Sequence, residues 1–330
     1  MNENPFENKI STILSKGKCP KIVLFDSETT LIFSNLISYS RFVANEFFCF
    51  ELITNKNRQK MSELTCFVFL RPENYLLMVD EVKNPFYTEY ILLFTNTIDN
   101  EKLEEIAIND MNTVVKEVHE VYIDVVKQDN HLFTCNYLNK PFDYSALMNF
   151  NRTVSGIFSF LRTVNFDPLI LYQTKSQVAK NISNELNLQL EPLKLKKTGC
   201  LVILDRKFDI LTPLLYGWTF QQMIDEIISI NNGIVKISKK DFDLSSNVTY
   251  NKIKFYDINR AAQEIKDFVA KIDQCKNNSK DLFEDIEEKS KNTDCAECLI
   301  LIQNKLLEVC FNYKEISELE LNLVQKKRQE

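Results

Sequence analysis

The sequence has little glycine and histidine, and these scarcities exclude several kinds of site. Only five glycines occur in 330 residues, and neither the G-x-x-x-x-G-K nor the G-x-G-x-x-G phosphate-binding pattern is present. His119 and His131 are the only histidines, and neither has an evident metal-binding or nucleophilic partner in the sequence. We therefore expect no cofactor and no metal site.

Long apolar runs are also missing. The runs at 66–70 and 91–94 have the length of strands and are too short to span a bilayer. The N-terminus lacks the apolar core of a signal peptide, so the nine cysteines are expected to be reduced thiols in the cytoplasm. Cys295 and Cys298 form a CxxC pair, but no second pair stands at zinc-site spacing. The net charge of −6, with both signs interspersed, argues against nucleic-acid binding.

Strands and helices alternate over residues 21–135. The expected strands are Lys21–Phe25, Phe47–Leu52, Leu64–Leu70, Tyr90–Thr95 and Val114–Tyr122. Helices are expected near 34–46, 73–83 and 100–108, the last with Asn100 as its cap. This alternation predicts an α/β domain, residues 1–135, with a parallel five-stranded sheet and helices on both faces.

A polar, proline-containing joint at 136–143 leads into a second, partial α/β domain, residues 136–217. Its expected elements are a helix with an apolar stripe from Leu147 to Leu161, a strand Leu169–Tyr172, a helix capped by Ser176 and a strand at 200–204. Five apolar residues in a row before Asp205 predict that the last strand is buried on both faces.

Residues 218–330 form a predicted helical domain. Thr219 and Gln222 have capping-box spacing ahead of an apolar helical face, and Asp257 is placed to cap a second helix. The charged stretch 274–294 fits either a solvated helix or a mobile segment. An apolar repeat from Leu299 to Leu319 predicts one long amphipathic helix.

Residues 201–228, LVILDRKFDILTPLLYGWTFQQMIDEII, resemble the signature of the SM family, the syntaxin-binding Sec/Munc proteins of vesicle fusion. The wording Gly-Trp-Thr-Phe-Gln is most similar to the vacuolar-protein-sorting branch, which works between the trans-Golgi network and endosomes. KIVLFDSETT at 21–30, the stretch 69–96 and the stretch 114–136 resemble the strand units of that family's first domain.

This resemblance implies a non-enzymatic cytoplasmic protein that binds a syntaxin-class SNARE and promotes SNARE assembly in vesicle docking. Membrane association would be peripheral, at endosomal or Golgi membranes, through the SNAREs. The family's returning strands of the middle sheet and the second half of its helical domain have no counterpart in the sequence. We therefore expect an incomplete middle sheet with an unpaired hydrophobic edge.

Two sets of residues follow from the resemblance. The expected pocket for a syntaxin N-terminal peptide is lined by Leu103, Ile106, Ala107, Val118 and Val121. Alternatively, Leu103 and Ile106 form the inward face of their helix. The structural signature comprises Asp205, Arg206, Asp209, Pro213 and Trp218. We expect Asp205 and Arg206 to be paired and buried, and Trp218 to pack at a domain joint.

A competing enzymatic hypothesis rests on Asp26. The sequence Asp26-Ser27-Glu28-Thr29 after the first strand resembles the D-x-D-x-T nucleophile loop of haloacid-dehalogenase phosphotransferases, with Glu28 in place of the second aspartate. The later strand ends lack the carboxylates that would hold Mg²⁺. The alternative is that Asp26 and Thr29 shape a strand-to-helix turn.

Overall fold

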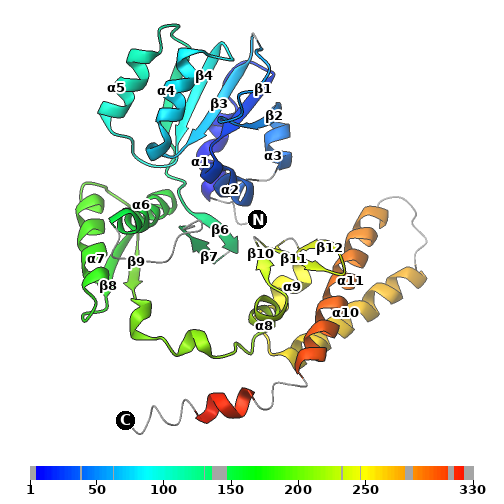
Figure 1. Cartoon of the computed structure of the whole chain (residues 1–330). Helices are drawn as coiled ribbons and strands as arrows, with labels where there is room; N and C mark the ends of the chain where they lie inside the picture. Colours follow the sequence, from blue (N-terminus) through cyan, green and yellow to red (C-terminus); the bar gives the residue numbers. More distant parts are fainter. Residues whose placement is uncertain are drawn as a thin grey trace. The chain divides into compact units, whose positions relative to one another are not determined.

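The computed structural model divides the chain into two compact units, Met1–Asp205 and Arg206–Glu330 (Figure 1). It describes residues 5–37, 39–61, 63–129, 131–135, 147–231, 233–245, 247–278, 285–310 and 316–322. The joint expected at 136–143 lies outside these ranges. Among the helices so described, none is both long enough and apolar enough to cross a bilayer.

A five-stranded parallel sheet forms the centre of the first unit, as predicted. Its strands are β1 (Lys21–Phe25), β2 (Phe47–Leu52), β3 (Thr65–Leu70), β4 (Glu89–Phe94) and β5 (Val115–Glu120). The spatial order is β2-β1-β3-β4-β5, and every neighbouring pair is parallel. β1 and β3 are buried along their whole length because helices cover both faces.

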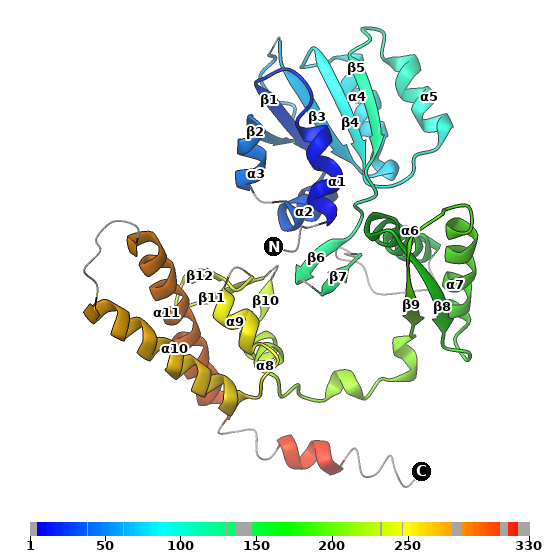
Figure 2. The same cartoon turned by 180° about the vertical axis from the view of Figure 1, so that it is seen from behind.

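Helices pack on both faces of this sheet (Figure 2). α1 (Pro5–Leu14), α2 (Ser27–Leu36) and α3 (Tyr39–Ala44) enclose one apolar cluster, and α4 (Leu76–Lys83) and α5 (Asn100–Asn109) enclose the other. The single helix expected at 34–46 is wrong, because α2 starts directly after β1 and ends before α3. Asn100 is the first residue of α5 rather than its cap, which is Asp99.

A short hairpin, β6 (Val126–Asp129) with β7 (Leu132–Thr134), follows the sheet. Then come α6 (Leu147–Val164), β8 (Phe166–Tyr172), α7 (Gln177–Leu190) and β9 (Lys197–Ile203), with β8 and β9 paired in parallel. Ser176 caps α7 as predicted, since its hydroxyl accepts the amide N–H of Ala179.

The prediction that the 200–204 strand is buried on both faces is wrong. α6 and α7 cover one face of the β8–β9 pair, where Ile170, Leu201 and Ile203 join an apolar cluster. The opposite face carries exposed apolar side chains: Leu169, Leu171, Val202 and Leu204. Because α6 and α7 pack on one face and the apolar side chains of the other face are exposed, β9 is only half covered.

The second unit is mostly helical, as expected, with 3₁₀ turns at Arg206–Phe208 and Thr212–Leu214. Its helices are α8 (Phe220–Ile227), α9 (Val248–Ile253), α10 (Ile258–Asn278) and α11 (Asp285–Cys310). Thr219 and Asp257 cap α8 and α10 as predicted. A three-stranded antiparallel sheet was not expected: β10 (Ile230–Asn231), β11 (Ile234–Ile237) and β12 (Lys240–Asp243).

Two further predicted segments include residues that the structure does not describe. The long helix expected from Leu299 to Leu319 is helical through Cys310 in α11 and again over 316–322, with 311–315 not described. In the charged stretch 274–294, the structure describes helical backbone through Asn278 and again from Asp285.

Candidate functional site

The expected peptide pocket lies where α5 packs over the edge strand β5. Residues at positions three and four apart share one face of a helix, so Leu103, Ile106 and Ala107 are neighbours on α5. Ile106 is fully buried in the core, Leu103 is half-buried against the same cluster, and Ala107 is exposed. Leu103 and Ala107 are therefore the accessible members of this wall, and Ile106 lies beneath them.

The candidates Val118, in β5, and Val121, directly after it, face opposite sides of the sheet. Val118 pairs with Leu92, whose side chain belongs to the cluster under α5, and Val118 remains 42% exposed. Val121 is buried in the cluster on the other face, which α1 and α2 cover. Because a peptide pocket must stay accessible from one side, including Val121 in its wall was wrong. Of the five expected residues, Leu103, Ala107 and Val118 remain accessible.

Neighbouring polar contacts hold α5 in place beside this surface. The Tyr75 hydroxyl, just before α4, donates to the Glu105 carboxylate at 2.8 Å, and this hydrogen bond raises the pKa of Tyr75. The Lys102 ammonium lies 5.8 Å from the centre of the same tyrosine ring. These contacts link the residue before α4 to α5 beside Leu103.

The signature residues at the end of β9 are not a buried ion pair. Arg206 and Asp209 pair at 3.7 Å with both side chains about half exposed or more, and Trp218 is 47% exposed. Asp205 accepts a hydrogen bond from the buried Ser176 hydroxyl at 2.7 Å, and its amide donates to Gln173 at 3.1 Å. Asp205 therefore ties the end of β9 to the start of α7, while the predicted burial of Arg206 is wrong. Packing of Trp218 at a domain joint stays a prediction.

Pro213 lies in the 3₁₀ turn Thr212–Leu214, at a position where its missing N–H costs no hydrogen bond. Asp209 accepts the amide of Thr212 at 3.1 Å, which starts that turn. These two signature residues therefore have local structural roles.

Asp26 is fully occupied as a helix cap. One carboxylate oxygen accepts the amides of Glu28 and Thr29, at 2.9 and 2.7 Å. The other accepts the amide of Arg71 at 3.1 Å and the side-chain amide of Asn74 at 2.9 Å. A carboxylate with four N–H donors at a buried position is a poor nucleophile, because its lone pairs are already engaged. This geometry favours the turn role over the phosphotransferase role.

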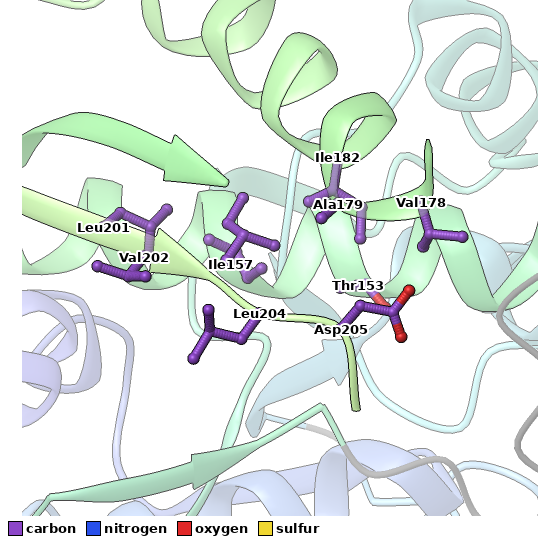
Figure 3. Close-up of a pocket in the computed structure, with 10 residues that line it drawn as sticks. Thr153, Ile157, Val178, Ala179, Ile182, Leu201, Val202, Leu204 and Asp205 are labelled. Atoms are coloured by element: carbon purple, nitrogen blue, oxygen red, sulfur yellow. The ribbon is translucent and has the colours of Figure 1, made fainter. Parts of the chain in front are cut away.

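An apolar pocket of about 230 Å³ opens between α6, α7 and β9 (Figure 3). Ile157 from α6, Ile182 from α7 and Val202 from β9 lie around it, with Asp205 at its end. No local pattern marks this pocket, because apolar side chains at helical spacing are equally expected in a closed core.

Two buried charge clusters were also missed. Arg58 pairs with Glu81, and Asp124 pairs with both Arg71 and Arg152. The partners are separated by 23 to 53 residues in the chain. No local pattern marks such pairs, although a charged residue directly after a buried strand, as at Arg71, is a usable signal.

Comparison with known proteins gives consistent matches. The model of the Sec1 family matches residues 21–295. Vacuolar protein sorting-associated protein 45 of Homo sapiens is 34% identical over 240 residues, covering 69% of this chain and 42% of the relative. Its counterpart of Dictyostelium discoideum is 35% identical over 240 residues, covering 70% and 42%. The chain thus spans less than half the length of these curated relatives.

Among solved structures, the SM protein Vps45 in complex with the Qa SNARE Tlg2 superposes with a TM-score of 0.87. The two are 27% identical, and the match covers 96% of this chain and 62% of that one. The structural match therefore includes residues of both units of this chain.

Proposed function

The chain belongs to the Sec1 family, and we propose on that basis that it binds a syntaxin-class SNARE and promotes SNARE assembly at endosomal or trans-Golgi membranes. The observation that carries the proposal is the superposition on Vps45, a protein solved in complex with a Qa SNARE. The identity to the vacuolar protein sorting-associated relatives supports the choice of membranes.

The physical basis of this activity is templating. SNARE segments are flexible before assembly, and ordering them costs conformational entropy. A preformed surface that holds such segments in register reduces the entropy still to be lost at assembly. The rigid five-stranded sheet, buried through β1 and β3, supplies a suitable support.

We propose that the chain acts by binding and has no catalytic centre. Asp26, the residue on which the enzymatic alternative depends, is engaged by four N–H donors. The match to the Sec1 family gives no support to the phosphotransferase hypothesis. Measurable phosphate-ester hydrolysis that Asp26→Asn abolishes would overturn this part of the proposal.

A syntaxin N-terminal peptide is proposed to dock on the surface formed by Leu103, Ala107 and Val118. These side chains are partly or fully accessible, and Ile106 supports them from the core. Membrane association would follow from the SNARE partner, which makes the protein peripheral to the membrane.

The direct test is calorimetric titration of the 330-residue protein with the cytoplasmic domains of syntaxin-class SNAREs from the same organism. We expect saturable one-to-one binding to one of them, and none to a SNARE of another class. Absence of binding to every syntaxin by a protein with a cooperative melting transition would overturn the proposed function.

A further inference from the structure

The carboxyl ends of the five parallel strands meet at one edge of the large sheet. Ligands of open α/β sheets bind in the crevice outside this edge, where the strand order reverses, which here is between β1 and β3. Asp26 follows β1 and Arg71 follows β3, so both lie at this crevice. Their side chains and backbone fill it with hydrogen bonds to each other and to Asn74 and Glu28.

Asp124, after β5, is the centre of the polar cluster at this edge. Its buried carboxylate accepts Arg71 Nε at 3.2 Å and Arg152 Nη1 at 2.8 Å. The second Arg152 amino group donates to the backbone carbonyl of Asp124, also at 2.8 Å. Arg152 belongs to α6, so a charge-assisted double contact joins that helix to the sheet.

The same face of α6 makes further contacts with the first sheet. Asn96, after β4, donates to the carbonyl of Ser155 at 2.9 Å, three residues beyond Arg152. Gly156 lets the helix backbone approach closely, since a Cβ there would lie 2.5 Å from the Cys135 sulfur. In the last two turns of the helix, Phe160 packs on the rings of Phe6 in α1 and Phe133 in β7.

The opposite face of α6 is chemically different. Val154, Phe158 and Leu161 are buried with residues of α7 and the β8–β9 pair in a continuous apolar cluster, to which Tyr122, just after β5, is the contribution from the side of the first sheet. Water cannot replace apolar contacts without a large loss of free energy, whereas it can replace hydrogen bonds and ion pairs. The two faces of α6 should therefore separate with very different ease.

We propose that Asp124, Arg152 and Asn96 form a latch that holds α6 to the sheet and opens as a unit. α6, α7 and the β8–β9 pair then move together away from the five-stranded sheet. Arg152 Nε is buried without a hydrogen-bond partner among the described residues, and opening would hydrate it. The edge of the sheet that binds a ligand in other proteins of this architecture would here bind α6 of the same chain, through Arg152.

Cys135 provides a readout of opening that does not depend on SNARE binding. The residue is partly exposed, but its sulfur lies against Gly156 and burial raises the pKa of its thiol, so labelling in the closed state should be slow. Cys66, the second residue of β3, is fully buried and reports global unfolding in the same sample. The experiment is timed alkylation of the whole protein under native conditions, with peptide mapping of the two cysteines.

We expect Asp124→Asn and Arg152→Gln to increase the labelling rate of Cys135 by about tenfold or more, because each removes one partner of a buried ion pair. Cys66 should remain as slow as in the wild type. Arg152→Lys keeps the charge but not the double contact, so its Cys135 labelling rate should lie between those of the wild type and Arg152→Gln. Glu28→Gln is the matched control: it removes the half-exposed partner of Arg71 and should leave the Cys135 rate unchanged.

A second pair of variants covers the case in which Asp124→Asn does not fold. Gly156→Ala should wedge α6 away and raise hydrogen exchange along α6, and adding Cys135→Ala should restore protection by removing the clashing sulfur. Equal labelling rates of Cys135 and Cys66 in every folded variant would overturn the latch, because α6 would then leave the sheet only on global unfolding. Lack of rescue by Cys135→Ala would overturn it as well.

Discussion

The guanidinium of Arg58 lies 2.5 Å from the carboxylate of Glu81, and both side chains are buried, at 0% and 1% exposure. Arg58 comes from the loop after β2 and Glu81 from α4. The Tyr90 hydroxyl donates to the same carboxylate at 2.8 Å, and burial raises the pKa of Tyr90. A charge pair with a hydrogen-bonded tyrosine is thus enclosed within the apolar core of the sheet's α4 face.

Glu81→Gln should destabilise the fold strongly, because it leaves the buried Arg58 charge without its partner. We expect a loss of about 3–5 kcal/mol in the free energy of unfolding, measured by urea denaturation. Asp209→Asn is the control, since the exposed pair with Arg206 contributes about 1 kcal/mol or less. Replacing both members by Arg58→Met and Glu81→Leu should recover most of the loss. Equal effects of Glu81→Gln and Asp209→Asn would contradict the role of burial.

Asp26→Asn should lower the stability of the fold and leave any background hydrolysis of a phosphate ester unchanged. An asparagine offers one acceptor oxygen where the carboxylate offers two, so the amides around Arg71 and Asn74 lose their acceptor. Buried donors left unsatisfied cost about 1–3 kcal/mol. Asp99→Asn is the control, because the Asp99 side chain accepts no amide of α5 and makes only an exposed pair with Lys102. Thermal melting of both variants beside the wild type is the measurement, and unchanged melting of Asp26→Asn would refute the cap.

Stability should rise with pH above about pH 8 through Lys9. Burial, and secondarily the charge of Arg162, lower the pKa of Lys9 to about 8. The unfolded lysine keeps a pKa of about 10.4, so between these values the unfolded state binds more protons and unfolding becomes less favourable as pH rises. The measurement is the free energy of unfolding of the wild type and of Lys9→Met at several pH values in that window, and the difference between them should grow with pH. A difference independent of pH would show that Lys9 titrates normally.

The sequence was sufficient where structure is local. Asp26 and Thr29 stand three residues apart, which is the spacing of a capping box, and the structure contains that box. The buried strands β1 and β3 could be predicted from their apolar runs, and their long connections indicated parallel pairing. Recognition of the family rested on residues 201–228, and the family match confirms it.

Features set by distant parts of the chain could not be predicted. The apolar run of β9 reads as a fully buried strand, but its burial depends on how many strands and helices flank it. The Arg58–Glu81 pair joins positions 23 residues apart that show no periodic signal. The β10–β12 sheet did have a signal, since Asn232-Gly233 between apolar residues favours a hairpin, and Gly233 has a φ of +79°.

The bare face of the β8–β9 pair should make the isolated protein associate. Val202 and Leu204, with exposures of 55% and 75%, lie beside Leu169 and Leu171 on that face. Contiguous exposed apolar side chains are an association liability, so the weight-average mass should rise with concentration in sedimentation velocity. Val202→Asp with Leu204→Asp should abolish the rise. Ile108→Asp on α5 is the control, and a concentration-independent monomer in the wild type would contradict the prediction.

Leu103→Arg should abolish binding of a syntaxin N-terminal peptide and leave the melting temperature nearly unchanged. Leu103 is half-buried at the accessible end of α5, so a longer charged side chain can turn to solvent while its charge and volume block the apolar surface. Ile108→Arg, on the same helix at a position 74% exposed, is the control for charge and should bind normally. Fluorescence titration of a labelled peptide gives affinity, and circular dichroism gives the melting temperature. Unfolding of Leu103→Arg would show that Leu103 is a core residue. Normal binding by the folded variant would place the peptide elsewhere on the protein.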